Sequence, residues 1–380
     1  MNQRSYLDYN ATAPLREEVR EAVAAALSLY GNPSSVHAEG RASRAAIEAA
    51  RVKVAALVGA RPEDVIFTSG GTEANALALA AQGGHAWHCY MSAVEHPSVL
   101  AGGRFYRETT TAIPVTPDGV IDLEILAKEL EKHHLGGWRP FVSLMAANNE
   151  TGAVQPVAET SKIVHEAGGL FHTDAVQAAG RIRLDMAALG ADMLSLSAHK
   201  IGGPKGVGAL VLGNGVPVEP LIKGGGQERR RRAGTENVAG IVGFGIAAEL
   251  AAADLGNAGA MAKLRGELEQ GALAIASDAV VLSAAVERLP NTSCIAVPGA
   301  KAETLVIGLD LAGVAVSSGA ACSSGKVEAS HVLRAMGLGE ELAQGAIRVS
   351  LGFATKRDDI ERFLRAFKEL IKRLRPRVAA

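Results

Sequence analysis

The middle of the chain alternates between helical and strand-like patterns of hydrophobic residues. Between residue 40 and about residue 250, segments with a helical pattern alternate with short, continuously apolar runs. The predicted helices lie at residues 42–58, 73–81, 123–133 and 157–167, and the predicted strands at 64–68, 87–92, 141–146, 170–173, 193–197 and 208–212. This alternation predicts an α/β fold with a mostly parallel sheet and helices on both of its faces. Because the strand runs lack polar–apolar alternation, we expect both faces to be buried.

The pattern changes near residues 251–256, at the end of an alanine-rich helix. Farther on, strands are predicted at 280–283, 292–297, 314–317 and 346–351, and an apolar stripe predicts a last helix, capped by Thr355 with Asp358. A chain of 380 residues is long for one core. We therefore predict a larger domain at residues 15–254 and a smaller one at residues 255–380, joined by the N-terminal segment 1–14.

Composition and charge argue against several classes of protein. The formal net charge is −1, which disfavours nucleic-acid binding. We find no apolar run of membrane-spanning length and no secretory signal at the N-terminus, so we expect a cytoplasmic protein. The three cysteines are too few and too widely spaced for a disulfide framework or a metal cluster. Cys89 and Cys294 lie in strand-like runs and should be buried, whereas Cys322 lies among small residues.

Polar residues follow four of the predicted strands directly, at the edge where open α/β sheets bind ligands. Lys200 could form a Schiff base with a carbonyl compound, and partial burial would favour its reactive, neutral amine. A glycine-rich turn with Thr72 opens a helix and suits a phosphate. Asp174 could hold a proton on a ring nitrogen. Each feature alone has a structural explanation, as a solvated lysine, an ordinary turn or a helix cap. Together they match the requirements of pyridoxal phosphate.

Two more polar residues lie in strand-like surroundings. His96 follows the strand at 87–92 and could stack on a flat ring and transfer protons, or be a polar loop residue. Arg348 lies inside the apolar run 346–351 and needs an anion there. That anion could be the α-carboxylate of a substrate or the partner in an internal salt bridge.

These segments, in this order, closely resemble the cysteine desulfurase family, which consists of class-V, fold-type I pyridoxal-phosphate-dependent enzymes. The likeness is to the iron–sulfur cluster and nitrogen-fixation type and covers nearly the whole chain. Eight motifs in register carry it, at residues 6–14, 31–37, 68–73, 148–152, 172–177, 197–200, 232–237 and 317–325. The resemblance implies an aminotransferase-like fold, in which a large domain with a mostly parallel seven-stranded sheet is joined to a smaller α/β C-terminal domain.

The resemblance also implies a role for each matched residue. Lys200 would bind pyridoxal 5'-phosphate covalently, and Asp174 and Gln177 would contact its pyridine nitrogen and its phenolic oxygen. His96 would stack on the ring and move protons. The phosphate would be bound by Gly71, Thr72, Ser197 and His199. Thr235 would reach the phosphate of the other subunit's cofactor, which implies a homodimer. Asn149, beside the cofactor, and Arg348 would hold the substrate.

The implied reaction converts L-cysteine to L-alanine and leaves the sulfur on Cys322 as a persulfide. An iron–sulfur scaffold or another acceptor protein would take this sulfur, and Cys322 could transiently bind a cluster, although no resident metal is expected. We expect residues 323–330 to be mobile. The alternatives are a selenocysteine lyase, another class-V aminotransferase, or an inactive docking subunit. The arginines at 229–232 fit a dimer-interface loop better than a nucleic-acid site, because aromatic residues are not interleaved with them, and no membrane partner is expected.

Overall fold

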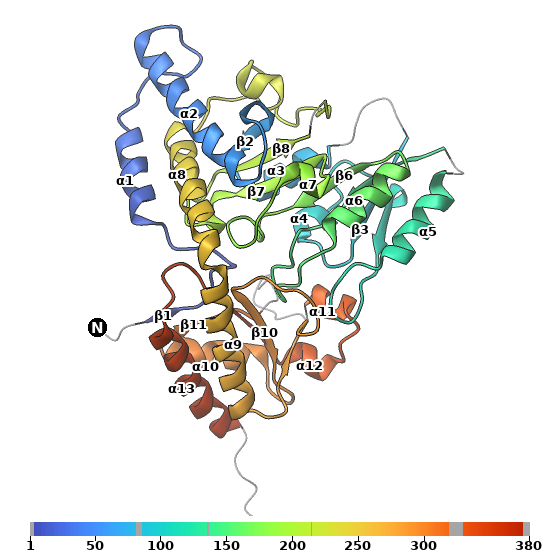
Figure 1. Ribbon diagram of the computed structural model, residues 1–380, viewed down its shortest axis with the longest axis vertical. Coiled ribbons are helices and arrows are strands. Elements are labelled where there is room, and N and C mark those ends of the chain that lie inside the picture. Colours follow the sequence, from blue (N-terminus) through green and yellow to red (C-terminus); the bar gives the residue numbers. More distant parts are fainter. Residues whose placement is uncertain (1–3, 81–85, 135–136, 214, 319–329, 375–380) are drawn as a thin grey trace, which may run out of the picture.

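The computed structural model describes residues 4–80, 86–134, 137–213, 215–318 and 330–374. Its centre is a seven-stranded sheet, as expected (Figure 1). The strands follow the spatial order β2 (Val65–Thr68), β8 (Gly208–Leu212), β7 (Met193–Ser197), β6 (Leu170–Asp174), β5 (Arg139–Ser143), β3 (Trp87–Ser92) and β4 (Thr110–Ile113). Only β8 runs antiparallel to its neighbours, and the other neighbouring pairs are parallel.

Helices cover both faces of this sheet, so successive strand residues enter different apolar cores. In β2, for example, Phe67 belongs to one buried cluster and Ile66 to another. The helices of this unit are α1 (Glu17–Ala26), α2 (Ala38–Leu57), α3 (Gly71–Ala78), α4 (Pro97–Leu100), α5 (Leu123–His134), α6 (Val157–Glu166), α7 (Met186–Leu189) and α8 (Val238–Asp254). The expected burial of both sheet faces is confirmed. Cys89 of β3 is buried, as predicted.

The C-terminal part of the chain forms a smaller layer of helices on a short sheet. Strand β10 (Thr292–Ala296) pairs antiparallel with β12 (Ala346–Ser350) and with β9 (Val280–Val281), and Cys294 of β10 is buried. The helices here are α9 (Ala258–Ile275), α10 (Ala302–Leu311), α11 (His331–Ala335), α12 (Glu340–Gln344) and α13 (Arg357–Leu374). Phe363 and Phe367 pack in a core cluster separate from those of the large sheet. The domain limits given above stay a prediction.

The N-terminal segment connects these two parts. Its strand β1 (Ser5–Tyr6) pairs with β11 (Val314–Ala315), and Leu7 packs in the C-terminal core. Three residues later, Asn10 donates side-chain hydrogen bonds to Thr292 Oγ1 (2.9 Å) and to the Asn149 carbonyl (3.1 Å). The Ala13 N–H then bonds the His199 carbonyl at 2.8 Å. The segment therefore ends beside the strand edge where the candidate site lies.

The predicted cap of the last helix is wrong. The helix α13 begins at Arg357, so the residue before it is Lys356, and the Lys356 N–H bonds Asp359 Oδ2 at 2.9 Å. Thr355 Oγ1 instead accepts a hydrogen bond from the Gly352 N–H, which closes the preceding turn. The acidic partner therefore lies one residue later than expected, because a capping side chain must match the actual start of the helix.

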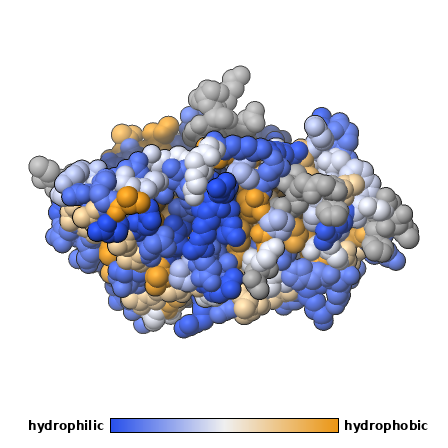
Figure 2. All heavy atoms as spheres, turned by 90° about the horizontal axis from the view of Figure 1, so that it is seen from above, coloured by the Kyte–Doolittle hydropathy of each residue, from blue (hydrophilic) through white to orange (hydrophobic). Residues whose placement is uncertain are grey.

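One helical stretch in the described part of the chain, Val238–Ile275, is long and apolar enough to cross a membrane by length and composition, contrary to expectation. It consists of α8, the short turn Leu255–Asn257 and α9. Phe244 and Ala247 of α8 are fully buried in the core beside the central sheet, so packing accounts for the apolar composition of this helix. Seen from above, the surface is mostly hydrophilic with smaller apolar patches between (Figure 2).

Candidate functional site

A cavity of about 280 Å³ lies at the carboxyl ends of β6 and β7. We call it the central cavity. It brings together ten of the predicted site residues: Gly71, Thr72, His96, Asn149, Asp174, Gln177, Ser197, His199, Lys200 and Arg348. These residues come from six separate segments of the chain, and the parallel strands carry several of them to one edge of the sheet.

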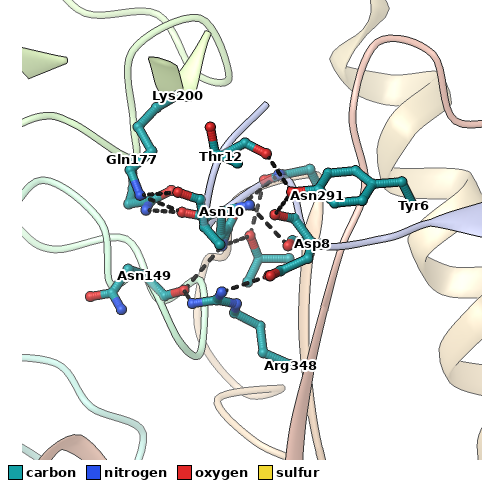
Figure 3. Close-up of polar contacts among 12 residues, drawn as sticks. Tyr6, Asp8, Asn10, Thr12, Asn149, Gln177, Lys200, Asn291 and Arg348 are labelled. Carbon is teal, nitrogen blue, oxygen red and sulfur yellow. Dashed lines mark hydrogen bonds and ion pairs between the residues drawn. The ribbon is translucent and has the colours of Figure 1, made fainter. Parts of the chain in front are cut away.

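Lys200 lies directly after β7, in a short 3₁₀ turn formed by Ala198–Lys200. Its Nζ donates hydrogen bonds to the carbonyl oxygens of Asn10 (2.6 Å) and Ala11 (2.9 Å), as Figure 3 shows for Asn10. Burial lowers the pKa of Lys200 to about 8, and the positive charges of Arg181 and Arg348 contribute to the same shift. About a tenth of the amine is therefore neutral at pH 7 and able to attack a carbonyl carbon.

Asp174 ends β6 and is only 7% exposed. Its Oδ1 accepts a hydrogen bond from the Val176 N–H at 3.0 Å, and its Oδ2 accepts one from Asn75 Nδ2 at 2.7 Å. Each carboxylate oxygen can accept two hydrogen bonds, so Asp174 can still accept one from a protonated ring nitrogen in the cavity. Asn75, the fifth residue of α3, was not predicted as a site residue.

Gln177 is held from two sides. Its Nε2 donates to the Asn10 carbonyl at 3.0 Å, the same oxygen that Lys200 contacts (Figure 3). Arg181 Nη1 donates to Gln177 Oε1 and, at 2.7 Å, to the Gln177 carbonyl. Because the guanidinium can only donate, it fixes the amide with its nitrogen away from Arg181. Burial, together with the charge of Arg348, lowers the pKa of Arg181 to about 9.

His96 is the N-cap residue of α4 and lines the central cavity. Its Nδ1 accepts a hydrogen bond from the Ser98 N–H at 3.1 Å and lies 2.7 Å from Ser98 Oγ. Desolvation by the surrounding protein lowers the pKa of the ring, the charge of Asp174 opposes this, and the charges of Lys200 and His331 add to it. The neutral imidazole is thus favoured in this position.

One end of the cavity suits a phosphate. Helix α3 begins at Gly71, and the N–H groups in the first turn of a helix have no acceptor within it. A Cβ atom at Gly71 would lie 3.0 Å from Val176 Cγ2 and 3.4 Å from Ser197 Cβ, so a side chain would crowd this end. Burial, and then the charges of Lys200 and Lys205, lower the pKa of His199 to about 4, which leaves it a neutral hydrogen-bonding group.

Of the two alternatives for Arg348, the structure contains the internal salt bridge. It forms an ion pair with Asp8 through Nη2 (2.8 Å), and its Nη1 donates to the Asn149 carbonyl (3.0 Å; Figure 3). Its Nε is buried and has no hydrogen-bond partner among the described residues. The guanidinium also lines the cavity, so a role in substrate binding stays a prediction.

Thr235 is a predicted site residue that does not line the central cavity. Thr235 is exposed and lines a separate hollow with Ser69 and Glu228. In the loop before it, Glu228 and the next two residues have positive φ angles of 43°, 56° and 66°. The buried carboxylate of Glu228 holds this turn in place, because it pairs with Arg51 Nη1 (2.7 Å) and Nη2 (3.1 Å). Cys322 lies outside the described residues.

Sequence reasoning gave no role to three residues that organise the site: Asn10, Asn75 and Ser98. Asn10 stands in one of the motifs that carry the family resemblance, and this was the one available signal for it. Asn75 lies within a helical pattern and Ser98 directly after a proline, positions at which a polar residue is ordinary.

The chain is similar to known proteins over nearly its whole length. The family model described as aminotransferase class-V matches residues 5–363. A cysteine desulfurase of Cereibacter sphaeroides is 48% identical over 98% of this chain and 97% of its own length. The cysteine desulfurase IscS of Dictyoglomus turgidum is 43% identical over 99% and 96%.

Solved structures agree as well. The structure of a NifS-like protein from Rickettsia africae covers 97% of this chain and 100% of its own, with a TM-score of 0.89 and 37% identity. This likeness extends over the central sheet and the C-terminal part alike, so it bears on the whole architecture. The chain therefore belongs to the cysteine desulfurases of the class-V aminotransferase family.

Proposed function

We propose that this protein is a pyridoxal-phosphate-dependent cysteine desulfurase. The observation that carries the proposal is the meeting of Lys200, with its lowered pKa, and Asp174 in one cavity that also contains the first turn of α3. Lys200 provides an amine that can attack an aldehyde, and Asp174 provides a carboxylate that can pair with a pyridine nitrogen. The first turn of α3 provides a binding site for a phosphate. The full-length likeness to cysteine desulfurases supports the choice of L-cysteine as the substrate.

The residues of the central cavity fit the cofactor. Lys200 would bind its aldehyde carbon, Asp174 its pyridine nitrogen and Gln177 its phenolic oxygen. Its phosphate would be held by Gly71, Thr72, Ser197 and His199, where a Cβ atom on residue 71 would intrude. Asn149 would lie beside the ring. When bound, pyridoxal phosphate withdraws electrons from the substrate carbon that loses its proton.

The remaining residues would hold the substrate and move its protons. Arg348 and Asn149 both line the cavity and would bind the α-carboxylate. His96, with its neutral imidazole, would donate and accept protons above the ring. In the sulfur transfer, the thiolate of Cys322 attacks the substrate sulfur. An S–S bond forms, the C–S bond breaks, and its electron pair stays on the carbon skeleton, which takes up a proton and leaves as L-alanine.

The assembly and the partners are also part of the proposal. Thr235 is exposed on a separate hollow, where a second copy of the chain could bring its cofactor phosphate. A homodimer would therefore complete each site. The persulfide on Cys322 would pass to an iron–sulfur scaffold or another acceptor protein, and we propose that this happens in the cytoplasm.

The experiment compares the wild type with Cys322→Ala and Lys200→Ala. With L-cysteine, the wild type should release sulfide and L-alanine in equal amounts in the presence of a thiol reductant. Cys322→Ala should keep the absorbance of bound cofactor and lose sulfide release, whereas Lys200→Ala should lose the covalently bound cofactor. Sulfide release by Cys322→Ala would refute the role of that cysteine.

The products separate the alternatives. Keto-acid formation would indicate an aminotransferase, and turnover of selenocysteine but not cysteine would indicate a lyase of that specificity. If the wild type contains no cofactor that borohydride can fix to Lys200, it is a docking subunit.

A further inference from the structure

A chain of hydrogen bonds connects Asp174 with His96 through two residues that have no assigned role. Asn75 Nδ2 donates to Asp174 Oδ2 at 2.7 Å and to Ser98 Oγ at 2.9 Å. Ser98 Oγ lies 2.7 Å from His96 Nδ1, and the Ser98 N–H donates to the same nitrogen at 3.1 Å. The four side chains all line the central cavity, although they come from β6, α3 and the first turn of α4.

The chemistry of these groups fixes the direction of each bond. An ionised carboxylate can only accept, so the amide nitrogen of Asn75, and not its oxygen, must face Asp174. That nitrogen then also donates to Ser98 Oγ. The hydroxyl proton of Ser98 is therefore free to point at His96 Nδ1, which already accepts the Ser98 N–H. A nitrogen that accepts from two donors carries no proton, so the neutral imidazole must carry its proton on Nε2.

The burial of the Asn75 side chain lowers the stability of the fold. Asn75 is 1% exposed, and its Oδ1 has no hydrogen-bond partner among the described residues. A buried acceptor without a partner destabilises the fold. Helix α3 nevertheless places a polar side chain here, where an apolar one would avoid that cost. Asn75 donates both of its side-chain hydrogen bonds to residues that line the central cavity, Asp174 and Ser98.

We infer that Asn75 and Ser98 are positioning residues that hold His96 in the tautomer with its proton on Nε2. Nε2 makes no hydrogen bond to a described residue, so it is the nitrogen left for a ligand. His96 thus meets a ligand as a hydrogen-bond donor and cannot begin as a base. This inference rests on the proposed function for its use in the reaction, where Nε2–H of His96 would donate a hydrogen bond to the ligand while Nδ1 stays bonded to Ser98.

Charged groups around the ring act on it from three elements. Asp174 of β6 favours the charged imidazolium, whereas Lys200 after β7 and His331 of α11 disfavour it. The two donors at Nδ1 favour the neutral ring as well, because the imidazolium would place an N–H against them. Removal of a donor should therefore raise the pKa of His96, and the size of a single hydrogen bond predicts a rise of about one pKa unit or less.

The test is nitrogen-15 NMR of the full-length chain labelled at histidine, with and without pyridoxal phosphate. Among the ten histidines, the His96 signals are assigned by their loss in His96→Gln. The variants are Ser98→Ala, the matched control Ser98→Thr, which keeps the hydroxyl, and Asn75→Ala. In the wild type, Nε2 should give the signal of a protonated ring nitrogen and Nδ1 that of an unprotonated one.

Ser98→Ala and Asn75→Ala should raise the pKa of His96 and populate both tautomers. Ser98→Thr should keep the pKa and the tautomer of the wild type. A proton on Nδ1 in the wild type, or an unchanged pKa in Ser98→Ala, would overturn the inference. If the pKa of His96 shifts in Ser98→Ala but not in Asn75→Ala, Asn75 is not a positioning residue. The measurement needs no substrate, so a protein that shows the Nε2 tautomer but does not desulfurate cysteine would refute the proposed function alone.

Discussion

Replacement of Arg181 by methionine should make Lys200 a weaker nucleophile at neutral pH. The pKa of Lys200 is lowered from 10.5 to about 8, first by burial and then by the charges of Arg181 and Arg348. Arg181 has a further contact, since it donates to Gln177, whose amide shares the Asn10 carbonyl with Lys200. Removal of a neighbouring positive charge favours the ammonium form, so the pKa of Lys200 must rise.

The expected magnitude follows from the ordinary strength of such interactions. Two unit charges about 8 Å apart interact by about 2 kcal/mol at an effective dielectric constant of about 20. Rearrangement of water and of Asp174 and Asp8, which oppose the shift, reduces the change to about one pKa unit. At pH 7, a pKa of about 8 leaves roughly a tenth of Lys200 as the free amine, and a pKa of about 9 leaves roughly a hundredth. Imine formation should therefore slow by about tenfold.

The assay is the rate at which the cofactor-free chain captures pyridoxal phosphate, followed by absorbance between pH 6 and pH 10. Lys200→Ala supplies the background from other lysines, and Arg181→Lys is the matched control, because it keeps the charge but not the planar group that fixes Gln177. The midpoint should rise by about one unit in Arg181→Met and stay in place in Arg181→Lys. Equal midpoints in Arg181→Met and the wild type, or equal shifts in both variants, would refute the electrostatic explanation.

Two further predictions concern stability. Glu228→Gln should lower the free energy of unfolding by up to about 3–5 kcal/mol, because it removes the buried anion of Arg51 and leaves only the exposed Glu48 as its ion-pair partner. Urea unfolding should be measured for both single variants and for Glu228→Gln combined with Arg51→Met. The double variant should lose less stability than the sum of the single losses, and additivity would contradict this. Burial raises the pKa of Glu150, which is 3% exposed, from 4.5 to about 7. The stabilising contribution of the protonated Glu150 is therefore complete below about pH 4.5 and is lost as the pH rises through 7. In the wild type, the free energy of unfolding should decline between pH 5 and pH 8, and Glu150→Gln should remove up to about 3 kcal/mol of that decline. Parallel pH profiles of the two proteins would show that Glu150 is not responsible.

The main strands of the central sheet could be predicted because they are continuously apolar. Strands β3, β7 and β8 have the predicted limits. Strand β4 was missed, since its threonines are partly exposed at the edge of the sheet and produce no apolar run. Strand β1 was missed for another reason. It has two residues and exists only through its pairing with β11, more than 300 residues away.

The candidate site was predictable to the extent that it follows strand ends. Asp174 and Lys200 stand directly after apolar runs, and the parallel strands bring both to the same edge. The supporting residues could not be found in this way. Asn75 reaches Asp174 only because α3 packs across β6 and β7, and this packing leaves no trace in local spacing. Contacts that depend on tertiary packing are therefore the part that a single sequence does not reveal.

The carbonyl oxygen of Asn10 has a mechanical consequence. It accepts hydrogen bonds from Lys200 and Gln177, while the side chain of the same residue is bonded to Asn291 and Thr292 beside the C-terminal core. A rotation of the C-terminal layer would pull on this residue and so shift the oxygen that holds the reactive amine. A tether of this kind converts movement of the C-terminal layer into a change in the freedom of one nitrogen atom.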